Sequence, residues 1–151
     1  MKKMISMFLC ILLVCSIGIL PVEATESNDL IINQTVEYLD DGSYFVETIS
    51  ESSVQLFSNT KTGTKTAKYY TSSNTLIYSV KVTGTFSYDG SSAEATDAVG
   101  MLLCHVSDAT PISLSDYTSG ASAIATGSVT YNGATLRKTV TLTCDKNGNL
   151  S

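Results

Sequence analysis

Apolar and polar residues alternate along much of this chain, most clearly from Thr75 to Tyr88. One face of that segment is apolar and comprises Leu76, Tyr78, Val80, Val82, Phe86 and Tyr88. Threonine, serine and lysine fill most of the other face. A period of two over these 14 residues predicts a half-buried strand and excludes an amphipathic helix. Gly84 interrupts the apolar face, so we expect a bulge or bend there.

The same alternation predicts six more strands, at 34–39, 43–50, 64–71, 99–106, 123–131 and 136–144. Turn residues separate several of them, namely Asp40-Asp41-Gly42, Ser72-Ser73-Asn74 and Asn132-Gly133. Segment 99–106 is apolar on both faces, which predicts a central strand. Two stretches lack the pattern: a flexible connection from Ser50 to Gly63 and a long loop from Ser107 to Gly120 that contains Pro111.

Seven short strands predict an all-β fold, an immunoglobulin-like antiparallel β-sandwich, with a partly open barrel as the alternative. We expect one domain over 25–151, with an N-terminal hairpin at 31–50 and the main strands at 64–145. Long loops at a sandwich end are common binding surfaces, which directs attention to the Ser107–Gly120 loop.

The first 24 residues predict export. Lys2 and Lys3 precede an uncharged, mostly apolar run, and Val22-Glu23-Ala24 approximates the small-x-small pattern of signal peptidase sites. We expect cleavage after Ala24, secretion, and no membrane attachment afterwards. A retained anchor is the alternative, but an apolar run of 17 residues is at the lower limit for spanning a bilayer. Cys10 and Cys15 do not fit a lipoprotein signal.

The charge balance excludes some partners. Without Lys2, Lys3 and Glu23 the chain keeps 7 basic and 13 acidic residues, a formal charge near −6. Nucleic acid and anionic membranes would require a basic face, so we expect neither as a partner. Lys61, Lys65 and Lys68 form the only basic cluster in the sequence, and we interpret it as a solvated strand face.

Cys104 and Cys144 remain after the predicted cleavage, and outside the cell such a pair can form a disulfide. The chain-entropy model gives such a bridge about 4 kcal/mol of stabilisation. Two buried free thiols are the alternative, and the sequence favours the bridge only slightly.

Three segments of the sequence carry a resemblance to a known group of proteins. They are Tyr69-Tyr70, the strand and turn from Tyr78 to Ala93, and the tail from Thr141 to Ser151. Together they resemble small secreted β-sandwich proteins of Gram-positive, mostly clostridial, bacteria. That group has no assigned activity, so the resemblance implies a location and a fold class. The group carries a cysteine soon after a Tyr-x-Gly turn, where this chain has Glu94-Ala95.

No catalytic, metal or cofactor motif stands out. Cys104 and His105 are adjacent, but neighbours on a strand point to opposite faces, so His105 cannot activate the thiol. One histidine and two cysteines fall short of a typical zinc site. The segment Asp145 to Asn149 is expected to form a turn rather than a calcium loop. Glu37 and Glu47 are expected to face solvent rather than to act as a glycosidase pair.

The remaining hypothesis is a non-enzymatic extracellular binding module for a protein, a glycan or the cell wall. Tyr69, Tyr70, Tyr117 and Tyr131 are the candidate binding surface, because a tyrosine ring offers apolar contact and a hydroxyl. The alternative is a structural protein that self-associates through sheet edges, with the strand starting at Thr64 as the candidate edge.

Overall fold

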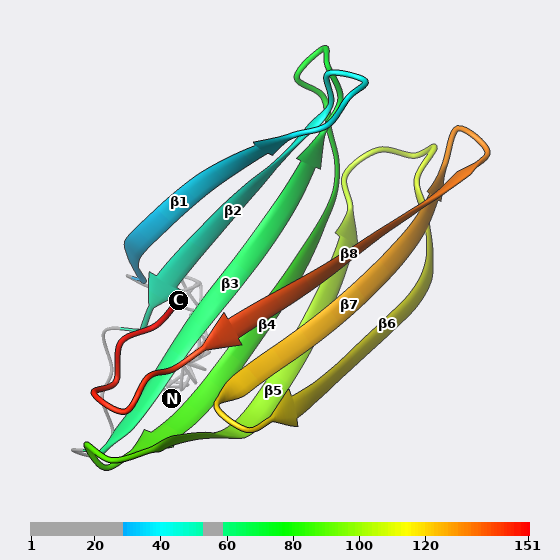
Figure 1. Ribbon diagram of the computed structural model, residues 1–151. Coiled ribbons are helices and arrows are strands. Elements are labelled where there is room, and N and C mark those ends of the chain that lie inside the picture. The colour runs from blue at the N-terminus through cyan, green and yellow to red at the C-terminus, as the bar shows by residue number, and fades with distance from the viewer. Residues whose placement is uncertain (1–28, 53–58) are drawn as a thin grey trace, which may run out of the picture.

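The computed structural model describes residues 29–52 and 59–151, and the predicted signal segment lies outside them. Eight strands make up the fold (Figure 1): β1 Leu30–Tyr38, β2 Tyr44–Glu51, β3 Thr60–Tyr70, β4 Leu76–Tyr88, β5 Ala93–Cys104, β6 Thr110–Ser119, β7 Ser122–Tyr131 and β8 Ala134–Thr143. No helix in this part of the chain is long and apolar enough to cross a membrane.

The strands form two antiparallel sheets, one of five strands in the order β1-β2-β3-β4-β5 and one of three in the order β6-β7-β8. The predicted all-β class with two layers is therefore confirmed. The immunoglobulin-like arrangement is not confirmed, because both sheets follow chain order, whereas immunoglobulin domains have Greek-key connections.

The eighth strand is β6, which occupies most of the segment predicted to be a loop from Ser107 to Gly120. That prediction is wrong. Pro111 is compatible with β6 because the strand lies at a sheet edge and its pairing with β7 shifts between Pro111 and Ser113. Every β6 residue is exposed, so no run of buried side chains marked the strand in the sequence.

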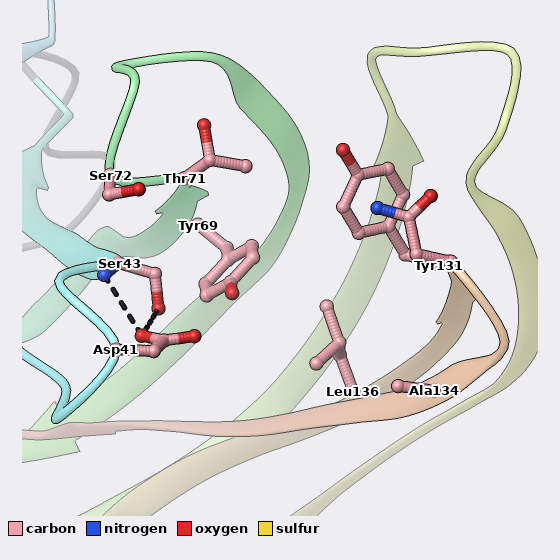
Figure 2. A pocket seen from close by; sticks show the side chains of 9 residues that line it. Asp41, Ser43, Tyr69, Thr71, Ser72, Tyr131, Ala134 and Leu136 are labelled. Atoms are coloured by element: carbon pink, nitrogen blue, oxygen red, sulfur yellow. Dashed lines mark hydrogen bonds between the residues drawn. The ribbon is translucent and has the colours of Figure 1, made fainter.

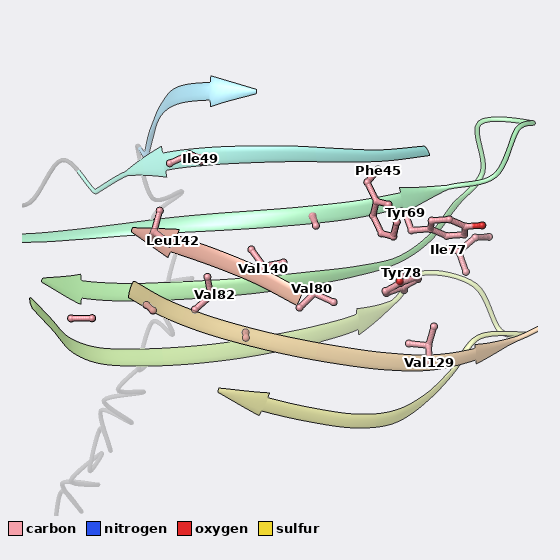
Figure 3. Packing of buried hydrophobic residues seen from close by; sticks show 14 of the residues in the cluster. Phe45, Ile49, Tyr69, Ile77, Tyr78, Val80, Val82, Val129, Val140 and Leu142 are labelled. Atoms are coloured by element: carbon pink, nitrogen blue, oxygen red, sulfur yellow. The ribbon is translucent and has the colours of Figure 1, made fainter. Parts of the chain in front are cut away.

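The core lies between the inner faces of the two sheets (Figure 3). Its largest fully buried side chains come mainly from β4, β7 and β8, and include Tyr78, Val80, Val82, Phe86, Val129, Val140 and Leu142. Four of these are the alternating residues of β4, so the predicted apolar face of that strand is the one that packs on the second sheet.

Small residues bring the two sheets close together. A Cβ atom added to Gly84 would lie 2.7 Å from the Cβ of Ala123, and one added to Gly127 would lie 2.7 Å from Cγ2 of Val80. Gly84 itself pairs regularly with β5, and the bulge expected there lies next to it, between Thr85 and Phe86. The glycine in the apolar pattern of β4 therefore marks a close approach of strands across the core.

Strand β5 differs from its prediction as a central strand, since it ends the order of the five-stranded sheet. Val99, Met101 and Leu103 on its outer face are 55%, 43% and 49% exposed. Only its inner face packs on the core, where Leu102 and Cys104 contact the buried cluster. The segment is therefore apolar on both faces because one face is buried in the core and the other carries a row of exposed apolar side chains.

The close approach at Gly127 predicts a measurable coupling. Gly127→Ala should reduce the free energy of unfolding by about 1–3 kcal/mol, because the new methyl group overlaps Val80. In a double-mutant cycle with Val80→Ala, the coupling energy should exceed about 0.5 kcal/mol, since the smaller side chain makes room. Urea denaturation of the four proteins measures both values. Strictly additive losses would contradict a direct contact between these two positions.

Candidate functional site

A hollow of about 320 Å³ lies at one end of the sandwich, where three hairpin turns meet (Figure 2). The β1–β2 turn contributes Asp41 and Ser43, and the start of the β3–β4 turn contributes Thr71 and Ser72. The β7–β8 hairpin forms the opposite wall. This volume is at the lower end of the range for small-molecule sites in proteins.

Tyr69 forms a rigid aromatic wall of the hollow. Its ring centroid lies 5.1 Å from that of Phe45 and 5.5 Å from that of Tyr78. Tyr69 is only 7% exposed, so its neighbours in the core fix its ring. A ring held in this way presents its remaining surface to a ligand with little loss of side-chain entropy.

Asp41 and Ser43 form the acidic rim. The Ser43 backbone N–H donates to Oδ1 of Asp41 at 2.9 Å, and the Ser43 hydroxyl donates to the same oxygen. These bonds, the hydroxyl first, lower the pKa of Asp41 and keep it ionised at neutral pH. Figure 2 shows the second carboxylate oxygen turned away from Ser43, where it can accept a hydrogen bond from a ligand.

The β7–β8 hairpin, with its turn at Asn132-Gly133, forms the opposite wall of the hollow. Both residues have positive φ, 49° and 76°, and Tyr131 pairs directly with Ala134 across the turn. The predicted hairpin is therefore confirmed. It places Tyr131 near the apolar side chain of Leu136, across the hollow from Tyr69 (Figure 2), and Asn132 also lines the hollow.

The four tyrosines of the predicted binding surface do not form one surface. Tyr69 and Tyr131 meet at the hollow. Tyr70 lies on the opposite face of its sheet and stacks on Tyr44, with ring centroids 5.1 Å apart. Tyr117 lies on β6, 54% exposed, and does not line the hollow. The sequence thus identified two residues of this site and missed the polar turn residues around them.

The expected disulfide is absent, since Cys104 and Cys144 are both free thiols. Cys144 is bonded through its N–H to Ala121 at 3.0 Å, and the neighbouring Gly120 accepts the N–H of Ala95 at 2.8 Å. Ala95 lies near the start of β5 and Cys104 at its end, roughly 30 Å along the strand. The two sulfurs therefore lie at opposite ends of the sandwich, beyond the reach of a bridge.

His105 points away from Cys104, as strand geometry predicts. Its Nε2 atom lies 3.0 Å from the hydroxyl of Ser79 on the outer face of the five-stranded sheet, while Cys104 packs on the core. Within the described residues, no acidic side chain is hydrogen-bonded to His105, and no residue of this pair lines the hollow at the turns. A serine nucleophile of the triad type depends on such an acid.

Asp145 forms a turn and is saturated by nitrogen donors. Its Oδ1 accepts the backbone N–H groups of Asn147 and Asn149 at 2.8 Å, and its Oδ2 accepts the Asn149 side-chain amide at 2.7 Å. Across residues 29–52 and 59–151, no three histidine, cysteine or acidic side chains are grouped as metal ligands.

Glu37 and Glu47 do not simply face solvent. Lys138 of β8 lies 2.9 Å from a carboxylate oxygen of each and 4.2 Å from the centroid of the Phe45 ring. Lys138 therefore connects the second sheet to the β1–β2 hairpin. An ion pair of this kind occupies the two carboxylates that a glycosidase would need free.

The basic cluster of the sequence is divided between two faces. Lys61 and Lys65 lie on the inner face of β3 and pair with Glu51 at 2.9 Å and Glu47 at 3.6 Å. Lys68 lies on the outer face, opposite Ser79. The prediction of a single solvated lysine face is wrong, because residues 61 and 65 share a side of the strand that residue 68 does not.

No protein-family model matches the chain, and neither the curated proteins nor the solved structures give a significant match. The function of the protein must therefore be inferred from the residues of the site itself.

The two thiols should differ in reactivity. Burial raises the pKa of both, and Cys144 is fully buried while Cys104 is partly exposed. Without denaturant, a maleimide should label Cys104 slowly and Cys144 only after unfolding, with the sites located by peptide mass spectrometry. Cys104→Ser is the control that removes the native-state label. A peptide pair linked by a disulfide between residues 104 and 144 would contradict the structure.

Proposed function

We propose that the protein is a secreted, non-catalytic binding module that holds a sugar unit of an extracellular glycan in the hollow at its hairpin turns. The observation that carries this proposal is the pairing of a fixed aromatic wall, Tyr69, with an ionised carboxylate, Asp41, and a second tyrosine, Tyr131. As in immunoglobulin-like sandwiches, the proposed binding surface lies at the loops of one end of two packed sheets.

The chemistry of a sugar matches this hollow. A pyranose has an apolar face that can lie on a tyrosine ring and a belt of hydroxyls that needs donors and acceptors around it. Serine and threonine hydroxyls, the Asn132 amide and the Asp41 carboxylate supply both kinds of group at the rim. Leu136 and Ala134 supply an apolar floor.

Charge narrows the glycan class. The acidic residues outnumber the basic ones by 14 to 9 in the whole chain, and the hollow carries Asp41 without a lysine or arginine in its lining. A phosphate- or sulfate-bearing ligand would be repelled there. Neutral sugars, or sugars with a free amine, are therefore the proposed ligands, and cell-wall polysaccharides are one extracellular source of them.

Export is part of the proposal. Residues 1–24 carry the positive start, apolar run and small-residue end of a signal peptide. The resemblance of residues 60–151 to small secreted proteins of clostridial bacteria supports the same location. A protein partner in place of a glycan is the outcome that the binding test below distinguishes.

Substitutions around the hollow test ligand binding. On a glycan array, the protein should retain a neutral or amino sugar, and Tyr131→Ala should weaken that binding by about fivefold, since an aromatic contact contributes about 1 kcal/mol. Asp41→Asn should weaken binding by a similar factor, because it removes the charge of the acceptor. Calorimetry gives the dissociation constants.

Tyr117→Ala is the matched control, because Tyr117 is an exposed tyrosine on a strand that does not line the hollow. It should leave the affinity unchanged. Equal losses in Tyr117→Ala and Tyr131→Ala would contradict a site at the turns. Binding only to a protein, with an empty glycan array, would replace the sugar by a protein partner.

Export has its own measurement. When the full chain is produced in a Gram-positive secreting host, the protein in the medium should begin at Thr25, as determined by N-terminal mass spectrometry. Ala24→Arg should block the cut, because signal peptidase requires a small residue before the scissile bond. Accumulation of uncut protein in the cells, without the substitution, would contradict the signal-peptide prediction.

A further inference from the structure

The described strands leave four sheet edges, those of β1, β5, β6 and β8, and three of them are covered or blocked. The β5 and β6 edges face each other. Oδ2 of Asp116 on β6 accepts the Gly100 N–H of β5 at 2.9 Å, and Gly120 accepts the Ala95 N–H at 2.8 Å. Side-chain and main-chain acceptors thus occupy donors that another strand would need.

The β8 edge is blocked in a different way. Thr143 exchanges two main-chain hydrogen bonds of 2.9 Å with Ser151, so the C-terminal residues cover the end of this edge. Further along β8, the exposed Arg137 places a positive charge on the strand. Both features disfavour pairing with another strand.

Strand β1 has none of these protections along its regular part. All nine residues are exposed, and they include no lysine, arginine or proline. The only charged residue is Glu37, whose carboxylate is paired with Lys138. Val36 is 47% exposed and Tyr38 is 74% exposed. A long exposed edge without these protections is the arrangement that adds a strand from another chain.

The register shows which main-chain groups are open. Leu39 donates its N–H to Ser43 at the hairpin turn, so every second residue from there, Glu37 and Thr35, bonds to β2. The N–H and C=O groups of Gln34, Val36 and Tyr38 therefore point to the free edge. The pairing shift between Ile31 and Asn33 ends this regular stretch on the N-terminal side.

We infer that β1 pairs antiparallel with β1 of a second copy of this chain, about a twofold axis at Val36. In that register the two Val36 residues lie opposite each other, and Gln34 of each copy lies opposite Tyr38 of the other copy. Glu37 lies opposite Thr35 of the other copy, so no two acidic side chains face each other, and each Glu37 keeps Lys138 as its counter-charge. The strand is thus complementary to itself in charge and in side-chain size.

The pairing extends an existing row of rings. Tyr38, Tyr44 and Tyr70 follow one another across β1, β2 and β3, with centroid distances of 5.5 Å and 5.1 Å. Gln34 of the second copy would cover the open side of Tyr38, which is the most exposed ring of the row. A twofold contact uses the same edge on both copies and therefore stops at two chains.

The molecular mass as a function of concentration tests the dimer. Full-length chain produced in a secreting host should rise from monomer to dimer mass between about 1 µM and about 500 µM in sedimentation velocity, the range of weak to moderate association. Val36→Lys should remain monomeric throughout, because it places two positive charges opposite each other. Val99→Lys is the matched control, an exposed valine on the outer face of β5, and should dimerise like the parent protein.

A second variant locates the axis. In a Cys104→Ser background, Val36→Cys should form a covalent dimer on mild oxidation, because directly opposed strand positions lie within disulfide reach. Val99→Cys in the same background should not. Circular dichroism confirms that each variant is folded.

Three results would overturn the inference: a parent protein that stays monomeric at the highest concentration, dimers that persist in Val36→Lys, or growth beyond dimers. None of them bears on the glycan array, because the hollow and the β1 edge use different residues.

Discussion

The structure depends on how closely the two sheets approach. Where Gly84 meets Ala123 and Gly127 meets Val80, there is no room for one more carbon atom. Gly100 lies in the same way against Ala125, where an added Cβ would be 3.2 Å from the alanine methyl group. These contacts hold the three-stranded sheet against β4 and β5 of the five-stranded one, and the larger side chains of the core fill the space around them.

This placement leaves the sheets unequal in coverage. The second sheet contacts β3, β4 and β5, and the β1–β2 hairpin extends past its edge, where Lys138 reaches across to it. The turn of this hairpin contributes Asp41 and Ser43 to one wall of the hollow. Among the described strands, β1, the outer strand of the same hairpin, pairs only with β2. Both the proposed sugar site and the proposed pairing edge follow from this offset of the two layers.

The sequence predicted the strands whose side chains alternate between core and solvent, such as β4, β7 and β8. It did not predict β6, because this edge strand has no buried face, its few apolar residues are exposed, and Pro111 suggested a loop. The start of β5 was missed because its core-facing residues there are alanines, which give a weak apolar alternation. Tyr69 and Tyr70 are neighbours in sequence and were grouped together, yet consecutive strand positions point to opposite sides, so only one of them could reach any given site. The hollow could not be predicted without knowing which strands belong to which sheet, since its walls come from turns that are distant in sequence.

The β1–β2 hairpin carries Asp41 and Ser43 at its turn and the unpaired edge along β1, and Lys138 is the charged link that holds it to the second sheet. Two ligands that contact the same structural element are thermodynamically linked when both favour the same position of that element. If a sugar in the hollow favours one position of the hairpin, and a second chain along β1 favours the same position, each raises the affinity of the other by an identical factor. Glycan binding and dimerisation would then be two coupled equilibria, although each could occur without the other.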